Sequence, residues 1–383
     1  MSTNTKAFIG IDAGTTGCTV MIFDEKGNAL GHGYKEYPSE SPYAGWGEQS
    51  LEKVWDGICV ASKQATSQAN LPNEAYVSVG FSSQRGTLCL LDKDKKPLQD
   101  SILWYCTRAR DYPEIFGQHI TPEEYQEHTG MQLSPLWVAA KIAWLRDNKP
   151  DTFEKTAWFA NGQEYFLYLL GADRWETDPA SLTLNGMMDI RKLDWSDRVL
   201  EMCGISRDRV PPVGPPSGMV GKVSKQASEA TGIPEGVILC RGAGDQQCAA
   251  IGAGVIRQGM AEFTVGTAGV MVAHLDSVDR IKGKNLWWGG HGVPNAWDIE
   301  GGAFCLGASL KWWRDNLGLD EVQEAESRNT SPYAVMVDKA QESPAGARGL
   351  LFHSFLASQV TPYYDADSRG GLIGLGNYHT RVD

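Results

Sequence analysis

AFIGIDAGTTGCTVMIFD, residues Ala7–Asp24, contains two apolar runs on either side of a glycine-rich segment. The runs Phe8–Ile11 and Thr19–Phe23 favour strands, and the segment Asp12–Gly17 (DAGTTG) favours a tight turn between them. We therefore predict a β-hairpin. An ordinary hairpin with a glycine turn would show the same pattern, so this stretch does not establish a function by itself.

The turn of this hairpin carries groups that suit a phosphate. Glycine at position 14 lets backbone N–H groups converge without a Cβ in the way, and Thr15 and Thr16 add hydroxyl donors. Asp12, at the end of the first strand, is placed to hold Mg²⁺ directly or through water. The sequence thus predicts a phosphate-binding hairpin with an associated metal site.

A second segment of the same design follows at Ala261–His274, with its bend at Gly266–Gly269. Two such hairpins indicate two related domains, and 383 residues are too many for one ordinary core. A candidate hinge lies at Gly252–Gln258. We therefore predict domains of residues 1–253 and 254–383.

Composition and charge exclude several classes of protein. Hydrophobic residues make up 42% and charged residues 21% of the chain, as in soluble globular proteins, and no apolar run is long enough to span a bilayer. The polar N-terminus shows no signal peptide. A net charge of −12 argues against a nucleic-acid partner. An acidic protein can still bind ATP when Mg²⁺ and N–H groups supply the positive field.

The cysteines and histidines show no metal-binding or disulfide pattern. The eight cysteines are scattered without a CxxC pair, and the seven histidines lack ligand spacing. We therefore expect a reducing, cytoplasmic location with mostly buried thiols. Cys18 and Cys248 border the glycine-rich turns, and packing is their expected role.

The predicted elements follow the order strand, strand, strand, helix, strand. This order is typical of a ribonuclease-H-like unit, in which helices flank a mixed sheet. The strands and helices that we expect after the hairpin are a strand at 31–37, a helix from the N-cap Ser50 to about Gln68, a strand at 76–81, helices at 121–146, 156–170 and 195–203, a strand at 237–240 and a helix through 248–254.

Asp245 follows the buried strand at 237–240 and lies among small residues in GAGDQQ, residues 242–247. Open α/β sheets present catalytic groups at the carboxyl ends of their strands. Phosphoryl transfer needs an acceptor for the proton of the substrate hydroxyl, so Asp245 is a candidate general base. Its position before Gln246–Ala250 also fits a helix N-cap, and both roles can hold at once.

In these motifs and their order, the chain resembles the FGGY carbohydrate kinases, which phosphorylate sugars and polyols. The resemblance covers nearly the whole chain and rests on GIDAGTT (10–16), GFSSQR (80–85), LW (103–104), GAGDQQ (242–247), TVGT (264–267), GGAFCLGASLKWWRD (301–315) and TPYYDADSRG (361–370). It implies an α/β fold of two ribonuclease-H-like domains of the actin-like ATPase type, with a cleft between them.

The resemblance also implies roles for individual residues. On the ATP side these are Asp12 for Mg²⁺, Gly14, Thr15 and Thr16 at the γ-phosphate, Gly266 and Thr267 as a second phosphate clamp, and Gly307 and Lys311 near the phosphates and ribose. On the sugar side, Arg85 would donate to vicinal hydroxyls and Trp104 would pack on the C–H face. Asp245 would be the general base and Gln246 a hydrogen-bonding partner of the substrate. Core packing is the alternative role for Trp104.

Departures from the family pattern bear on the substrate. Gly86 stands where glycerol kinases carry an acidic residue, and Gln84-Arg85-Gly86 stands where xylulokinases carry Met-His-Gly. The run GDQQ is close to glycerol kinases, whereas residues 131–193 look closer to xylulokinases and autoinducer-2 kinases. We expect a small sugar or polyol, a ketopentose-like one first, and leave open whether the protein is a homodimer.

Family members continue beyond the segment that matches TPYYDADSRG with a part that holds the adenine. We therefore expect an incomplete second domain, weak ATP binding and slow turnover. The alternative reading is a catalytically impaired, truncated sugar-binding remnant of such a kinase. An actin-like ATPase is a weaker alternative because it would have no use for Arg85 and Trp104, and a sugar-responsive repressor is weaker still because no DNA-binding segment precedes Ala7.

Overall fold

The computed structural model describes residues 5–266, 268–280, 285–303, 305–356, 359, 361–363 and 368–383. The chain divides into two compact units. The first unit comprises Met1–Met260, Ala273–Ile281 and Trp287–Ile299, and the second comprises Ala261–Val272, Lys282–Leu286 and Glu300–Asp383. The domain boundary that we placed between residues 253 and 254 stays a prediction.

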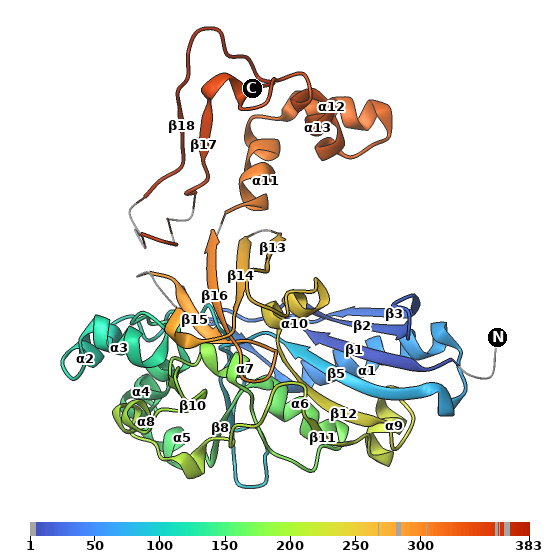
Figure 1. The fold of residues 1–383 in the computed structure, drawn as a ribbon, viewed down its shortest axis with the longest axis vertical. Helices are drawn as coiled ribbons and strands as arrows, with labels where there is room; N and C mark the ends of the chain where they lie inside the picture. Colours follow the sequence, from blue (N-terminus) through green and yellow to red (C-terminus); the bar gives the residue numbers. More distant parts are fainter. Residues whose placement is uncertain are drawn as a thin grey trace. The chain divides into compact units, whose positions relative to one another are not determined.

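A mixed six-stranded sheet organises the first unit (Figure 1). Its strands, in spatial order, are β11 (Met219–Lys222), β12 (Ile238–Gly244), β5 (Tyr76–Ser83), β1 (Ala7–Ala13), β2 (Gly17–Asp24) and β3 (Ala29–Glu36). The pairs β1–β2, β2–β3 and β11–β12 are antiparallel, whereas β5 runs parallel to both β1 and β12. The predicted hairpin and the predicted ribonuclease-H-like order of elements are confirmed.

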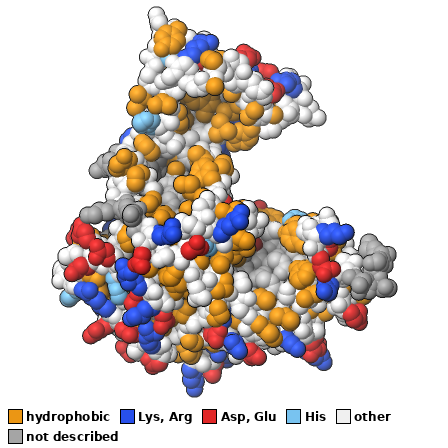
Figure 2. Space-filling view, in the orientation of Figure 1, with side chains coloured by type: hydrophobic (Ala, Val, Ile, Leu, Met, Phe, Trp, Pro, Cys, Tyr) orange, Lys and Arg blue, Asp and Glu red, His pale blue; other side chains and the backbone are white. Residues whose placement is uncertain are grey.

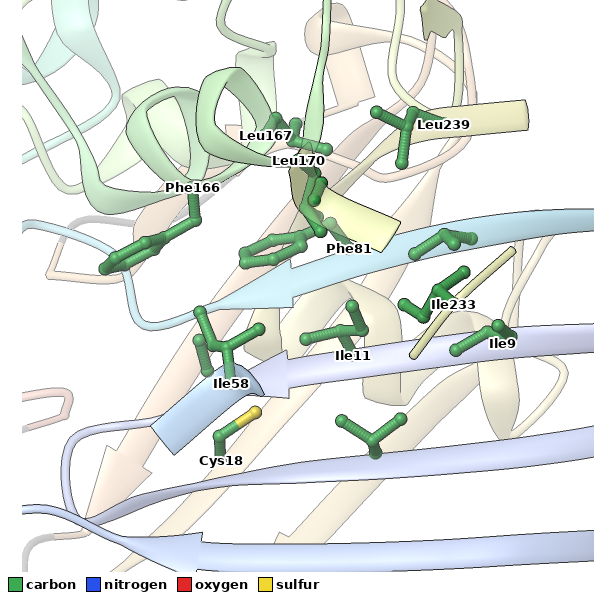
Figure 3. Packing of buried hydrophobic residues seen from close by; sticks show 14 of the residues in the cluster. Ile9, Ile11, Cys18, Ile58, Phe81, Phe166, Leu167, Leu170, Ile233 and Leu239 are labelled. Carbon is green, nitrogen blue, oxygen red and sulfur yellow. The ribbon is translucent and has the colours of Figure 1, made fainter. Parts of the chain in front are cut away.

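One face of this sheet carries the apolar core of the unit (Figure 3). Ile9 and Ile11 of β1 are buried there, while Gly10 and Asp12, at the alternate positions, stay exposed. The predicted helix α1 (Leu51–Ala69) begins at the N-cap Ser50, whose side chain accepts a hydrogen bond from the N–H of Lys53. Residues of α1, α6 (Gly162–Leu170) and α9 (Lys225–Thr231) complete this core. The opposite face of the sheet is therefore the one that can present polar groups.

A second apolar core holds the helical part of the first unit. Its helices are α2 (Tyr112–Gly117), α3 (Pro122–Thr129), α4 (Val138–Asn148), α5 (Pro150–Lys155) and α8 (Asp197–Cys203). The other helices of the unit are α7 (Pro179–Thr183) and α10 (Asp245–Gly252), and its short paired strands are β4 (Glu48–Gln49) with β7 (Ser101–Ile102), β6 (Cys89–Leu91) with β8 (Trp158–Ala160), and β9 (Met188–Asp189) with β10 (Asp194–Trp195).

Two predicted helices differ from the structure. The helix expected over 121–146 is two helices, because α3 ends at Gly130, which adopts a left-handed conformation (φ 82°). The helix expected over 156–170 begins only at Gly162, after the capping box of Asn161 and Glu164. The residues before it form β8, which pairs with β6.

The second unit contains the predicted second hairpin, β13 (Ala261–Val265) and β14 (Gly269–Leu275). These strands belong to a sheet of order β13-β14-β16-β15, with β15 at Trp287–Gly290 and β16 at Trp297–Ala303; β14 and β16 run from one unit into the other. The unit continues with α11 (Gly307–Asn316), α12 (Leu319–Arg328), α13 (Pro332–Ala340), β17 (Leu351–His353) and β18 (Gly371–Ile373). Helices α12 and α13 were not predicted from the sequence.

The surface carries charges of both signs. Figure 2 shows acidic and basic side chains interspersed on the visible face, together with apolar side chains of the second unit. Trp312, Val337 and Leu351 are among the large apolar residues of the second unit that are exposed. Among the described residues, no helix has the length and apolar character needed to cross a bilayer.

Helix α1 offers a matched test of the core. Ile58 is fully buried against the sheet, whereas Val60, two residues further on, is 39% exposed. Replacing Ile58 by Ala removes apolar contacts and leaves a cavity, so we expect a loss of about 2–5 kcal/mol in the free energy of unfolding. The control V60A should change it by less than about 0.5 kcal/mol. Urea denaturation followed by circular dichroism measures both, and equal midpoints would contradict this packing.

Candidate active site

The carboxyl ends of three parallel strands bring the predicted site residues of the first unit together. Strands β1, β5 and β12 end at Ala13, Ser83 and Gly244, and Ser82 is the register partner of both Asp12 and Ala243. The segments that follow these strands therefore begin at the same edge of the sheet. They carry the hairpin turn, Arg85 and Asp245.

Asp12 lies at this edge with its carboxylate bound to a neighbouring strand. The hydroxyl of Ser82 donates to Asp12 Oδ1 over 2.7 Å. Protein atoms crowd the carboxyl group and raise the pKa of Asp12 above its ordinary value, and the Ser82 hydrogen bond partly offsets this. A carboxylate held in this way is a suitable oxygen ligand for Mg²⁺. The described residues contain no cluster of three or more His, Cys, Asp or Glu that could hold a metal ion alone.

The hairpin turn uses its backbone partly for its own structure. The N–H of Gly14 donates to the carbonyl of Gly17 over 3.0 Å, and the carbonyl of Gly14 accepts from the Tyr37 hydroxyl over 2.7 Å. Thr16 is exposed, and its hydroxyl makes no hydrogen bond to a described residue. Of the two threonines in the turn, Thr16 is thus the one with a free hydroxyl.

Thr15 instead closes a ring of hydrogen bonds. Its hydroxyl donates to Gln84 Oε1 (2.8 Å) and accepts from the indole N–H of Trp104 (3.0 Å). Gln84 Nε2 donates to Gln49 Oε1 (3.0 Å), and Gln49 Nε2 donates to the carbonyl of Thr15 (2.8 Å). The single hydroxyl hydrogen of Thr15 is therefore committed within the protein. Trp104, which is 38% exposed, is joined directly to the phosphate hairpin.

Arg85 and Asp245 form an ion pair beside this ring. Arg85 Nε lies 3.6 Å from Asp245 Oδ1, and the arginine side chain is almost completely buried while the carboxylate remains about one-third exposed (34%). Gly244 makes this possible, since a Cβ at this position would lie 2.2 Å from Arg85 Cδ. The structure thus brings together the candidate base and one of the two predicted sugar-side residues.

A β-bulge sets the position of Asp245. The register of β12 against β5 shifts between Cys240 and Ala243, and Gly242 within the bulge has φ 74°. Gln163, fully buried on α6, directs its amide nitrogen to the carbonyls of Arg241 (2.9 Å), Ala243 (3.3 Å) and Phe81 (3.3 Å). The two N–H hydrogens of this amide are thus shared among three carbonyls next to the irregular pairing.

Helix α10 begins at Asp245 itself, and its N-cap is Gly244. The predicted N-cap role of Asp245 is therefore wrong by one residue; its Oδ1 accepts a hydrogen bond from the N–H of Gln246, over 2.9 Å. Gln246 Oε1 is buried and has no hydrogen-bond partner among the described residues. Burial raises the pKa of the nearby Cys248 thiol to about 12, so that thiol is protonated at neutral pH, in keeping with a packing role.

The predicted residues of the second unit lie on the second hairpin and on α11. The N–H of Gly307, the first residue of α11, donates to the carbonyl of Gly266 over 3.0 Å, which fixes the start of the helix against the bend. Lys311 is exposed one helical turn after Gly307. Thr267 lies outside the described residues. Gly266, Gly307 and Lys311 thus belong to one local structure within this unit.

Sequence reasoning missed several residues that shape the site. Ser82, Gln84, Gln49 and Gln163 hold the predicted residues in place by hydrogen bonds. The run SSQR, residues 82–85, was part of a recognised motif, but only its arginine received a role. For Gln163, a polar residue at the start of an apolar helix was the available signal.

The two threonines of the turn provide a matched test of the hydrogen-bond ring. T15V keeps the β-branched shape but leaves Gln84 Oε1 and the Trp104 indole N–H without their partner, so we expect a loss of at least about 1 kcal/mol in stability. T16V removes an exposed hydroxyl and should change stability by less than about 0.5 kcal/mol. Denaturant midpoints of the two variants measure the difference; equal values would contradict the ring.

Comparison with known proteins covers nearly the whole chain. Residues 7–252 match the N-terminal domain, and residues 261–383 the C-terminal domain, of the FGGY family of carbohydrate kinases. A xylulose kinase of Bacillus subtilis is 28% identical over 98% of this chain and 73% of its own length. A glycerol kinase of Thermococcus kodakarensis is 30% identical over 97% of this chain and 72% of its own length.

Solved structures agree on the fold. The crystal structure of xylulose kinase from Rhodospirillum rubrum superimposes with a TM-score of 0.87 at 24% identity, over 98% of this chain and 74% of that one. This likeness supports the two-domain α/β architecture of actin-like ATPases. The two family domains matched over residues 7–252 and 261–383 show that the chain belongs to the FGGY family of carbohydrate kinases.

Proposed function

We propose that this kinase transfers the γ-phosphoryl group of ATP to a hydroxyl of a ketopentose-like sugar or related polyol, with Asp245 as general base. The observation that carries the proposal is the Arg85–Asp245 pair at the strand edge that also bears the phosphate hairpin. In the proposed step the substrate oxygen bonds to the γ-phosphorus, the bond from that phosphorus to the bridging oxygen breaks, and ADP leaves. The hydroxyl proton passes to the carboxylate of Asp245.

On the sugar side, the proposal assigns roles to Arg85, Trp104 and Gln246. Arg85 would donate to vicinal hydroxyls, and the exposed part of the Trp104 indole would pack on a C–H face. The unpartnered Gln246 Oε1 would accept from a substrate hydroxyl. Gln246 directly follows Asp245 in the sequence, and Arg85 pairs with Asp245. Trp104 belongs to the ring of hydrogen bonds around Thr15.

On the phosphate side, the two threonines take different roles. Thr16 would donate its free hydroxyl to the γ-phosphate, whereas Thr15 would contribute through its backbone, because its hydroxyl is committed to Gln84. In the second unit, Gly266 and Gly307 would contact phosphate through the backbone, and Lys311 would add a positive charge. Thr267 keeps its proposed role as part of the second clamp.

Mg²⁺ fits the donor chemistry at Asp12. One carboxylate together with phosphate oxygens and water is a common way to bind this ion, which would neutralise charge on the phosphates. Asp12 would hold it directly or through water, and Ser82 would keep the carboxylate oriented.

The proposal also places the enzyme in the cytoplasm, which is supported by the absence of any disulfide among its eight cysteines, all of them in described positions.

The choice of substrate is tested by a screen for ADP release. Pentuloses, pentitols, glycerol and related polyols are compared in parallel, with a xylulose kinase such as that of Bacillus subtilis as the positive control. We expect the highest kcat/KM with a ketopentose. ADP release that does not depend on any sugar would favour a plain ATPase, and no release with any of these compounds would contradict the proposed function.

Replacement of Asp245 by Asn tests the base. The amide keeps the size of the side chain but cannot take up the proton, so kcat should fall by about 10²–10⁴-fold. The sugar affinity by titration calorimetry should stay close to that of the unchanged protein, whereas the melting temperature should fall because the amide removes the negative charge that faces the buried Arg85. A near-normal kcat in D245N would remove Asp245 from the mechanism.

A further inference from the structure

A lysine is completely buried in the helical core of the first unit. Lys141 lies in the middle of α4 and has no exposed surface, between Ala140 and Ile142, which are also buried. Buried lysines are rare and are normally paired with a carboxylate. Among the described residues, Lys141 pairs with no carboxylate. A charged side chain in this position needs another explanation.

Three backbone carbonyls surround its amino group. Lys141 Nζ donates to the carbonyls of Leu103 (2.9 Å), Gly86 (3.0 Å) and Trp104 (3.2 Å). An ammonium group has three N–H donors and a neutral amine has two, so only the protonated lysine satisfies all three acceptors. No other side chain of this length offers three donors from one atom.

These carbonyls belong to the two segments that carry the sugar side of the proposed site. Gly86 directly follows Arg85, and the carbonyl of Trp104 belongs to the second sugar-side residue itself. One segment follows β5 and the other follows β7, and they are more than fifteen residues apart in sequence. The ammonium group therefore adds three hydrogen bonds to a junction that is also held by the backbone pair of Leu88 and Ile102 and by the hydrogen bonds of Thr15.

We propose that Lys141 is a positioning residue of the sugar site, which fixes the distance between Arg85 and Trp104 without touching the substrate. This inference rests on the proposed function of those two residues. It predicts that Lys141 acts more strongly on sugar affinity than on ATP affinity, because its three acceptors lie in the two sugar-side segments and reach the phosphate hairpin only through the hydrogen bond from the Trp104 indole to Thr15. A lysine that only fills the core would have no such selectivity.

Protonation gives this role a pH dependence. Burial lowers the pKa of Lys141 to about 7; the nearby Cys106 raises it and Arg108 lowers it, and Arg108 is itself paired with Glu48. Above this pKa the neutral amine can serve only two of the three carbonyls, so sugar affinity should fall as the pH rises. The lowered pKa also affects the free energy of unfolding. Between pH 7 and 10.5 the unfolded chain keeps the lysine proton and the folded protein loses it, so the contribution of Lys141 to stability rises with pH over this range. A rise in pH is thus expected to weaken sugar affinity while it increases the contribution of Lys141 to stability.

The variant K141M tests the proposal. Methionine keeps an unbranched side chain of similar length but removes all three donors. We expect the KM for the best sugar of the screen to rise at least tenfold, while the KM for ATP stays within about twofold. The matched control is I142A on the same helix, which removes buried apolar contacts but no hydrogen bond to either loop.

The outcomes separate the possible roles. If K141M and I142A lower the melting temperature alike and the KM for the sugar does not change, Lys141 is structural and the proposal is wrong. If K141M does not fold, the proposal is tested on the protein without substitutions. Its KM for the sugar should rise between pH 6 and 8, and a KM that does not change over this range would overturn the proposal. Absence of sugar phosphorylation by the unchanged protein would instead contradict the proposed function, and the inference would fall with it.

Discussion

The parallel pairing of β1, β5 and β12 is the constraint on which the site depends. It brings Asp12, Arg85 and Asp245, which are far apart in sequence, to one edge of one sheet. The alternation of β1 makes this register strict, because Ile9 and Ile11 fill the core while Asp12 faces away from it. A slip of one residue would bury the carboxylate and expose the isoleucines, so the packing of the core and the placement of the site are selected together.

Around this edge, glutamine side chains form hydrogen bonds with backbone carbonyls at the hairpin turn and at the β-bulge. Gln49 joins the hairpin turn to Gln84, and Gln163 supplies donors to the bulge before Asp245. An amide both donates and accepts, so one glutamine can connect several partners without adding charge. Lys141 does comparable work for the sugar-side loops, and there three hydrogen bonds offset only part of the cost of burying a charge, since the pKa of Lys141 stays lowered. The site is thus held by polar contacts inside an otherwise apolar unit.

The sequence predicts the parts of the structure that depend on local pattern. The hairpin at Ala7–Asp24, helix α1 and the order of strands follow from apolar periodicity and turn residues, and they are confirmed. The helix expected over 156–170 is partly wrong because the short strand β8 forms only by pairing with β6, a contact that no local pattern shows. The hydrogen bonds of Thr15 could not be predicted for the same reason, since its partners lie 69 and 89 residues away. The proposed role of Arg85 came from motif resemblance and that of Asp245 first from its position after a buried strand, and their proximity is a result of the fold.

The unmet acceptor on Gln246 has a consequence for selectivity among ligands. In the proposed function, a substrate hydroxyl would donate to the buried Gln246 Oε1, and a buried acceptor left without its donor costs about 1–3 kcal/mol. A deoxy analogue of the same shape would fill the same volume and leave the oxygen unsatisfied. Discrimination of about 5- to 150-fold against such an analogue would then arise from the missing hydroxyl, without any steric exclusion.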